Sequence, residues 1–236
     1  MKALAIDTSN LVMGVAVIDG NTIIGEYSTN LSKNHSIRLM PAIRDLMQEV
    51  EVEPKQLDRI IVAHGPGSYT GVRIGVTIAK TLAWTLNIPI VGVSSLEVLA
   101  LNGQLFEGVV SPLFDARRGQ VYTGLYGTKG GRFQTVIEDQ IIMLKDWVGQ
   151  LRQLDKKVLF LGNDVGLHEA VIKEVLQDQA VFASPTLFNP RPGELAMIGI
   201  NREPEEVHSF VPNYIRLAEA EAKWLAEHGA RGQISN

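Results

Sequence analysis

Two short segments carry residue types suited to binding an anion. Asp7-Thr8-Ser9 follows an apolar run, and a carboxylate beside two hydroxyls at a strand end can orient a magnesium-bound phosphate. Gly65-Pro66-Gly67-Ser68-Tyr69-Thr70-Gly71 follows another apolar run, and small residues there let helix N-terminal amides approach an anion. Each segment also has a purely structural interpretation. For Asp7-Thr8-Ser9 it is a hairpin turn whose side chains bond to their own backbone. For the glycine-rich segment it is a tight strand-to-helix turn capped by Thr70. The candidate phosphate-facing residues are Asp7, Thr8, Ser9, Gly65, Gly67, Ser68 and Thr70.

The glycine-rich segment matches none of the named nucleotide or nucleophile motifs. No Gly-Lys-Ser/Thr follows it, as a Walker loop requires, and its third glycine comes one residue late for a dinucleotide fingerprint. Ser68 lacks the glycine two residues away on each side that a nucleophile elbow has. The segment therefore predicts a loop between strand and helix without specifying an enzyme class.

The residues that bind transition metals are absent or scattered. The chain has no cysteine, which excludes disulfides, thiolate nucleophiles and cysteine-ligated metal sites. The five histidines (His35, His64, His168, His208 and His228) lack the three- or four-residue spacing that places two imidazoles on one helix face. We expect no sequence-local metal motif.

Charged residues concentrate in one further turn. Asp115-Ala116-Arg117-Arg118-Gly119 separates two strand-like runs, and its adjacent arginines are able to hold a phosphate or a partner's carboxylate. A solvated turn with a salt bridge is the alternative. Asp115, Arg117 and Arg118 are therefore candidate contacts to a partner or to a phosphate-bearing ligand.

A stripe of small side chains follows the glycine-rich segment. Gly71, Gly75, Ala79 and Ala83 recur every four residues in the predicted helix Thr70–Leu86. Each interior glycine costs a helix about 1 kcal/mol relative to alanine, so the stripe must serve close approach to another backbone. It predicts either packing on the chain's own sheet or a helix–helix interface with another subunit.

The elements that position these segments repeat once along the chain. Three strand-like runs, a predicted helix at His35–Val50, a strand, Thr70–Leu86, a strand and a short helix at Ser95–Leu101 form the first set. The same order recurs from Gly108 to a last helix at Gly193–Asn201, and an amphipathic helix, Leu217–Glu227, lies beyond it. We predict an α/β protein with two βββαβα domains: 1–104, to which the C-terminal helix 214–236 returns, and 105–213.

Length and composition agree with this division. The 236 residues suffice for one or two domains, and a hydrophobic fraction of 45% with 20% charged residues is typical of globular proteins. The net charge of −4 argues against a protein whose surface is basic overall and binds nucleic acid through that charge. The apolar run at the N-terminus is too short for a signal-peptide core and no run reaches membrane-spanning length, so we expect a cytoplasmic protein.

Read together, the motifs resemble those of the TsaB family. The resemblance rests on Ala5-Ile6-Asp7-Thr8-Ser9, His35-Ser36 with Pro41, the stretch Gly65–Gly75, Asp115-Ala116-Arg117-Arg118 and Pro212-Asn213-Tyr214-Ile215-Arg216. It implies an actin-like ATPase fold of the RNase H-like type. It also implies a role in forming threonylcarbamoyladenosine next to the anticodon of tRNAs that read codons beginning with A.

The resemblance further implies a non-catalytic scaffold and activator subunit. Such a subunit pairs with TsaD, acts together with TsaE, forms a homodimer when alone and meets tRNA through the complex. The resemblance thus makes Asp115, Arg117 and Arg118 candidate contacts to a partner or to tRNA. It has no cofactor of its own, since ATP and metal are used by the partners. Relatives similar to TsaD carry a His-x-Glu-Gly-His metal motif where this chain has Ser95-Leu96-Glu97-Val98-Leu99, and serine and leucine cannot replace imidazole as ligands.

The resemblance implies that the first two helices form a bundle with the partner, which favours the interface interpretation of the small-residue stripe. The expected interface residues are Arg38, Pro41, Gly71, Val72, Gly75, Ile78, Ala79, Leu82 and Ala83. The rival function is an ATP-dependent phosphotransferase or ATPase of the same superfamily, with Asp7 and the Gly65–Gly71 loop as its phosphate-binding elements.

Overall fold

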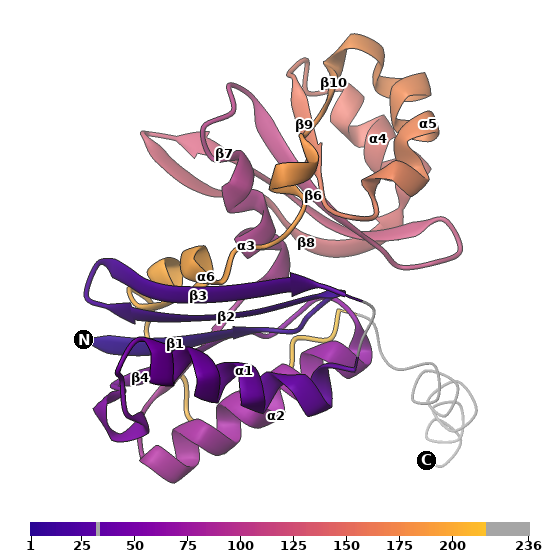
Figure 1. Cartoon of the computed structure of the whole chain (residues 1–236). Helices are drawn as coiled ribbons and strands as arrows, with labels where there is room; N and C mark the ends of the chain where they lie inside the picture. Colours follow the sequence, from indigo (N-terminus) through magenta and orange to yellow (C-terminus); the bar gives the residue numbers. More distant parts are fainter. Residues whose placement is uncertain (32–33, 216–236) are drawn as a thin grey trace, which may run out of the picture.

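The computed structural model describes residues 1–31 and 34–215, which form two lobes, each built around a five-stranded mixed sheet (Figure 1). The predicted helix Leu217–Glu227 lies outside these residues, as does the rest of the segment 214–236 beyond Ile215. Within the described ranges, no helix has the length and apolar character needed to cross a membrane.

The first half of the chain alternates strands and helices as the periodicity predicts. Its elements are β1 (Lys2–Asp7), β2 (Val12–Asp19), β3 (Thr22–Asn30), α1 (His35–Glu49), β4 (Arg59–Ala63), α2 (Tyr69–Leu86), β5 (Ile90–Val93) and α3 (Ser95–Ala100). The sheet has the order β3-β2-β1-β4-β5, with an antiparallel meander at one side and parallel strands at the other. Gly20, at φ +57°, makes the turn between β2 and β3.

The second half repeats this topology with different residues. Its elements are β6 (Val109–Asp115), β7 (Gln120–Lys129), β8 (Arg132–Met143), α4 (Leu144–Arg152), β9 (Val158–Leu161), α5 (Val165–Leu176), β10 (Ala180–Phe182) and α6 (Pro192–Gly199). The sheet order β10-β9-β6-β7-β8 is the order of the first sheet read from the other edge. The predicted duplicated α/β arrangement of the actin-like fold is therefore confirmed.

Each sheet is covered on both faces. Helices α1 and α2 pack on the face of the first sheet that points away from the second lobe, through Leu39, Ile43 and Val76 against Leu4 and other strand residues (Figure 1). Helices α4 and α5 cover the outer face of the second sheet in the same way. Apolar side chains on the two inner faces are covered by α3 and α6, which lie between the sheets.

The last helix of each half packs on the sheet of the other half. Leu96, Leu99 and Ala100 of α3 lie against the second sheet, and Leu195 and Ala196 of α6 lie against the first. This differs from the sequence analysis, which placed Ser95–Leu101 in the first domain and Gly193–Asn201 in the second. The reason is that each inner sheet face needs an apolar cover, and the sequence pattern of a helix does not specify which sheet it covers.

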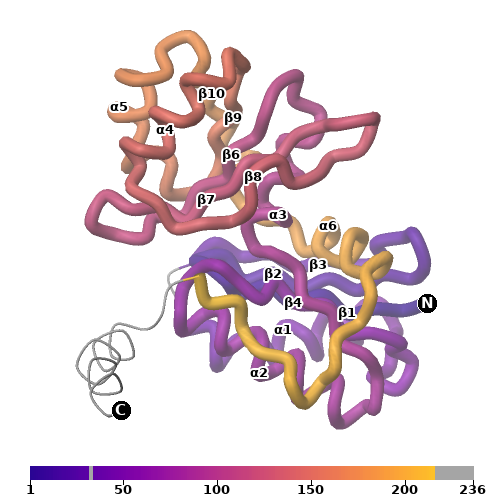
Figure 2. The backbone as a smooth tube through the Cα atoms, turned by 180° about the vertical axis from the view of Figure 1, so that it is seen from behind, coloured from indigo at the N-terminus to yellow at the C-terminus, as the bar shows by residue number. Residues whose placement is uncertain are grey.

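After α6 the chain crosses back over the first lobe as a strap, defined as residues 202–215 (Figure 2). Glu205 forms an antiparallel bridge with Ile90 on β5. Lys80 Nζ donates to the carbonyl oxygens of His208 (2.7 Å) and Phe210 (3.0 Å), and the amide of Asn213 donates to the carbonyl of His64 (2.8 Å). The strap therefore belongs to the first lobe, with α6.

Candidate functional site

The two predicted anion-binding segments meet at the end of β1. The Ser68 amide donates to the carbonyl oxygen of Ser9 at 2.7 Å, and Thr8 Oγ1 donates to the carbonyl oxygen of Gly71 at 2.7 Å. Ser68 also caps α2, because its side chain accepts a hydrogen bond from the Gly71 amide. The structure thus brings the turn and the loop together, because β1 and β4 are neighbouring parallel strands.

Their contact is too close for side chains at two of the glycines. A Cβ atom on Gly67 would lie 2.1 Å from the carbonyl oxygen of Ser9, and one on Gly71 would lie 2.2 Å from that of Thr8. No real Cβ atom approaches a backbone oxygen this closely. These glycines therefore let the loop pack directly onto the turn.

This packing corrects part of the phosphate prediction. Thr8 and Ser9 are fully buried, and the Ser9 hydroxyl donates to Asp7 Oδ1 at 2.7 Å. Gly65 is buried beneath the carbonyl oxygen of Asn213. The prediction is wrong for these three residues, because their polar groups are used within the chain or are covered by it. Of the others, Ser68 and Thr70 are exposed and Gly67 is half-buried.

Asp7 has a buried oxygen that no group of the protein contacts by a hydrogen bond. Its side chain is buried, and Oδ1 accepts hydrogen bonds from the amide (2.8 Å) and hydroxyl (2.7 Å) of Ser9. Oδ2 is buried and has no hydrogen-bond partner in the protein. Burial raises the pKa of the Asp7 carboxyl, and the bonds from Ser9 oppose that rise only in part. The carboxylate therefore costs stability when it is ionised.

We predict that Asp7→Asn stabilises the protein at neutral pH by about 1 kcal/mol, because a neutral amide keeps the oxygen that Ser9 contacts and removes a buried charge. A raised carboxyl pKa stabilises the fold below the unfolded-state pKa, and that stability is lost as the pH rises through the folded-state pKa. The advantage of the variant should therefore shrink at about pH 5. Urea unfolding at both pH values measures it.

Asp19→Asn is the matched control, because its shift has the opposite sign. The side chain of Asp19 is 44% exposed, and its hydrogen bond from Lys2 lowers the pKa of its carboxyl. Its contribution is present at neutral pH and is lost as the pH falls through the lowered pKa. An Asp7→Asn variant that is less stable than the unmodified protein at both pH values would contradict the account of Asp7.

The expected partner interface is wrong for the small-residue stripe. Gly71, Val72, Gly75, Ala79 and Ala83 are buried within the chain, where α2 packs on the first sheet. A Cβ atom on Gly75 would lie 2.6 Å from Thr8 Oγ1, so this glycine also serves internal packing. These five residues cannot contact another subunit, and the alternative of packing on the chain's own sheet holds.

The side of α2 next to the buried stripe forms a partly exposed apolar surface together with α1. We define this α1–α2 face by three exposed side chains of α1 and three half-buried ones of α2, which also pack against the first core: Ile37, Met40, Pro41, Ile74, Ile78 and Leu82. Ile37 is 71% exposed and Met40 is 44% exposed. A groove of about 610 Å³ runs between the helices, with Met40 and Pro41 on one wall and Leu82 on the other.

Three of the four remaining expected interface residues lie on this face. Pro41 is exposed, and Ile78 and Leu82 are half-buried at its edge. Arg38 is half-buried on another side of α1, where Nη2 donates to Thr29 Oγ1 on β3 at 2.8 Å. The structure therefore places Arg38 against the edge of the sheet.

The predicted arginine turn is the tip of the β6–β7 hairpin. Arg117, Arg118 and Gly119 have φ values of +63°, +55° and +74°, which places two exposed arginines in the left-handed region that glycine favours. Asp115 fixes the base of the tip by accepting from the Arg117 amide (3.2 Å) and by contacting His168 Nε2 on α5 (3.0 Å). The hairpin thus presents its arginines on a fixed backbone.

Comparison with known proteins places these features in a family. A family model described as TsaD, tRNA N6-adenosine threonylcarbamoyltransferase, matches residues 23–224. The chain is 55% identical over 225 residues to the tRNA threonylcarbamoyladenosine biosynthesis protein TsaB of Bacillus subtilis (strain 168), covering 95% of this chain and 98% of the relative. The chain belongs to the TsaB family. It therefore has a role in tRNA threonylcarbamoyladenosine biosynthesis.

More distant TsaB relatives and solved structures agree. The TsaB protein of Escherichia coli (strain K12) is 33% identical over 128 residues, which are 53% of this chain and 55% of that protein. A Pseudomonas aeruginosa protein described as similar to the peptidase YeaZ superposes with a TM-score of 0.78 at 26% identity, covering 91% of this chain and 99% of that one. Most of this chain therefore has the same fold as that solved structure.

The two positions at which the resemblance expects the histidines of a metal motif lie inside the protein. Ser95 and Leu99 are fully buried on α3. Ser95 Oγ accepts from the Gly65 amide at 3.2 Å, and Leu99 packs against the second sheet. Within residues 1–31 and 34–215, no three histidine, aspartate or glutamate side chains are arranged to hold a metal ion.

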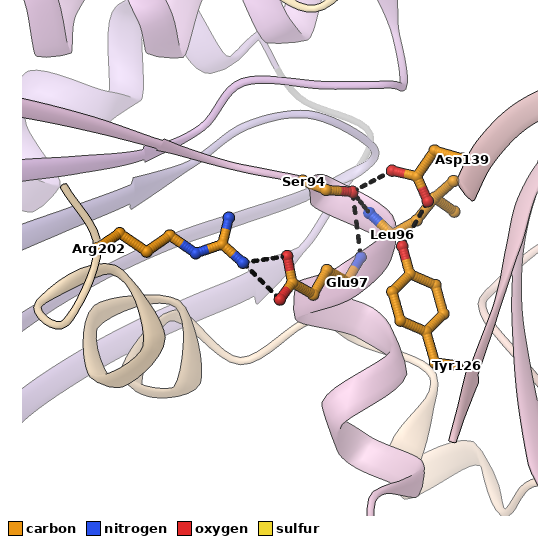
Figure 3. A network of polar contacts seen from close by, with 6 residues as sticks. All are labelled: Ser94, Leu96, Glu97, Tyr126, Asp139 and Arg202. Carbon is orange, nitrogen blue, oxygen red and sulfur yellow. Dashed lines mark hydrogen bonds and ion pairs between the residues drawn. The ribbon is translucent and has the colours of Figure 1, made fainter. Parts of the chain in front are cut away.

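Sequence reasoning missed a polar cluster at the junction of the lobes. Ser94, Tyr126 and Asp139 are hydrogen-bonded to one another, and Glu97 pairs with Arg202 beside them (Figure 3). The sequence held a weak signal for this cluster: Asp139 is a charged residue within the strand β8, and Tyr126 carries a hydroxyl within the apolar strand β7. Nothing in the sequence relates the two positions to Ser94.

Proposed function

We propose that this chain is a non-catalytic partner subunit in forming the threonylcarbamoyl group on the adenosine next to the anticodon of tRNAs that read codons beginning with A. It binds TsaD as a heterodimer in the cytoplasm, acts together with TsaE and forms a homodimer when alone. The partners supply the ATP and metal chemistry, and tRNA binds to the complex.

The observation that carries this proposal is the exposed α1–α2 face. Soluble monomers rarely expose large contiguous apolar patches, and those that occur mark interaction sites. Here two neighbouring helices present Ile37, Met40 and Pro41 beside Ile74 and Ile78, with a groove of about 610 Å³ between the helices. A partner helix packed over the α1–α2 face and its groove would bury these side chains, and two related subunits would compete for the surface.

The buried residues of α3 support a role without bond-making chemistry. A metal ligand needs a donor atom directed at open space, whereas Ser95 Oγ is bonded to the Gly65 amide and Leu99 has no donor atom. The chain's contribution is then to hold TsaD in its active conformation through the contact at the α1–α2 face.

The test is reconstitution of tRNA threonylcarbamoylation from purified components. With TsaD, TsaE and the enzyme that supplies the activated threonylcarbamoyl group present, omission of this chain should abolish multiple-turnover modification, and its addition should restore it. A system that modifies tRNA equally well without the chain would refute the proposal.

One observation favours the rival function, an ATP-dependent phosphotransferase or ATPase. The unpartnered Asp7 Oδ2 is suited to a cation, and ATP with magnesium would bring one to the end of β1. Against it, the loop after β4 is packed on Thr8 and Ser9, where a phosphate would need room. Calorimetry of the isolated chain with ATP and magnesium separates the two functions, since micromolar binding with turnover would favour the ATPase.

A further inference from the structure

The Ser94 cluster sits where the chain crosses from one lobe to the other. Ser94 lies between β5, the edge strand of the first sheet, and α3, which packs on the second sheet. Its hydroxyl accepts the amides of Leu96 and Glu97 at 3.2 Å each and donates to Asp139 Oδ2 (Figure 3). Asp139 Oδ1 accepts a hydrogen bond from the Tyr126 hydroxyl.

The partners of the cluster come from both lobes. Next to Ser94, the amide of Ser95 donates to the carbonyl oxygen of Gly65 at 3.0 Å, which holds the crossing point to the loop after β4 in the first lobe. Tyr126 and Asp139 belong to β7 and β8 of the second sheet. The Asp139 carboxylate therefore fastens the second sheet to the point at which the chain leaves the first.

A second polar contact crosses the junction beside it. Glu97 on α3 accepts both of its bonds from Arg202 Nη2, and the carbonyl oxygen of Arg202 accepts from Arg59 on β4 at 2.8 Å. Since α3 packs on the second sheet and Arg59 belongs to the first, this ion pair also joins the two lobes. Around Asp139 the charged groups are thus Glu97, which is neutralised by Arg202, and the exposed Glu138 on the same strand.

The hydrogen bonds of the cluster can all form in only one relative orientation of the two lobes. Both oxygens of Asp139 are used, by donors from two different elements, and burial raises the pKa of its carboxyl. Tyr126 and Asp139 share the second sheet, so a rotation of the lobes that moves Ser94 away leaves Oδ2 of this half-buried carboxylate without its donor, which is costly.

We infer that Ser94, Tyr126 and Asp139 form a latch that fixes the angle between the two lobes. Each lobe has its own apolar core, so the latch constrains their orientation more than the folding of either. It sets the position of the Asp115–Gly119 hairpin on the second lobe relative to the α1–α2 face on the first. The inference is independent of the proposed function.

The absence of cysteine from the chain allows a direct test. Spin labels on the exposed positions Glu49→Cys at the end of α1 and Lys145→Cys on α4 report the distance between the lobes by pulsed electron resonance. In the otherwise unmodified protein we expect one narrow distance distribution. Asp139→Ala should broaden or shift it, while Gln134→Ala, an exposed change on the same strand, should leave it unchanged.

Tyr126→Phe is the second variant, since it removes one donor and keeps the ring that packs against α3. It should broaden the distance distribution less than Asp139→Ala does. If Asp139→Ala fails to fold, Tyr126→Phe alone tests the latch. A distribution that stays as narrow as that of the unmodified protein in the folded variants overturns the latch. Equal broadening by Gln134→Ala also overturns it.

Discussion

Replacing Gly71 with alanine is expected to lower the free energy of unfolding by about 2–3 kcal/mol, although alanine is the better helix former. The added Cβ atom would lie 2.2 Å from the carbonyl oxygen of Thr8, and a backbone atom in a hydrogen-bonded turn cannot move aside cheaply. The change also disturbs the Thr8 hydroxyl, which donates to the Gly71 carbonyl at 2.7 Å. Urea unfolding of the purified variant measures the loss.

Gly149→Ala is the matched control, because Gly149 lies inside α4 and a Cβ atom there would meet nothing within 4 Å. It should gain up to about 1 kcal/mol from helix propensity alone. A Gly71→Ala variant of unchanged stability that loses partner binding would instead place the small-residue stripe at a subunit interface, and would contradict the packing described above.

The second large effect is expected at the α1–α2 face. Ile37→Asp should weaken association with TsaD by about 100-fold or more, since a carboxylate would be buried against an apolar partner surface without a counter-charge. Folding should be unaffected, because Ile37 is 71% exposed and lies in the first turn of α1, where an acidic side chain interacts favourably with the helix dipole. Calorimetric titration of TsaD measures the affinity.

Leu105→Asp provides the control for this prediction. Leu105 is 93% exposed, between α3 and β6 and away from both helices, so the same chemical change there should leave the affinity unchanged. If the homodimer uses the same face, Ile37→Asp should also make the isolated chain monomeric in sedimentation experiments, whereas Leu105→Asp should not. Equal affinities for the two variants would contradict the assignment of the face.

The elements of the fold follow from local patterns, but their assignment to a sheet does not. Alternating and four-residue periodicities located the strands and helices because each element buries one side. The pattern is ambiguous at the end of β8. The periodicity from Ile142 to Leu154 predicts a helix, but Ile142 pairs with Val121, so β8 continues to Met143 and the helix α4 begins at Leu144. The exchange of α3 and α6 depends on long-range packing that periodicity does not encode.

The site was predicted less well than the fold, for a similar reason. The sequence placed Asp7 and the glycine loop each at the end of a strand, and the pairing of β1 with β4 brings them together. Whether the glycines approach a ligand, a partner or the chain itself depends on what lies opposite, which here is Thr8 and Ser9. The neighbours of the stripe pointed to the last of these outcomes. Val72 and Val76 widen the stripe into an apolar face of the helix, and such a face usually packs on the core of the same chain.

The central claim is that the chain supports tRNA modification by binding a partner through the α1–α2 face. Its most direct test is the rate of threonylcarbamoyl transfer to tRNA in the reconstituted system, with the unmodified chain, Ile37→Asp or Leu105→Asp added at one concentration. We predict full activity with the unmodified chain and with Leu105→Asp, and little above background with Ile37→Asp. Full activity with Ile37→Asp would contradict the account.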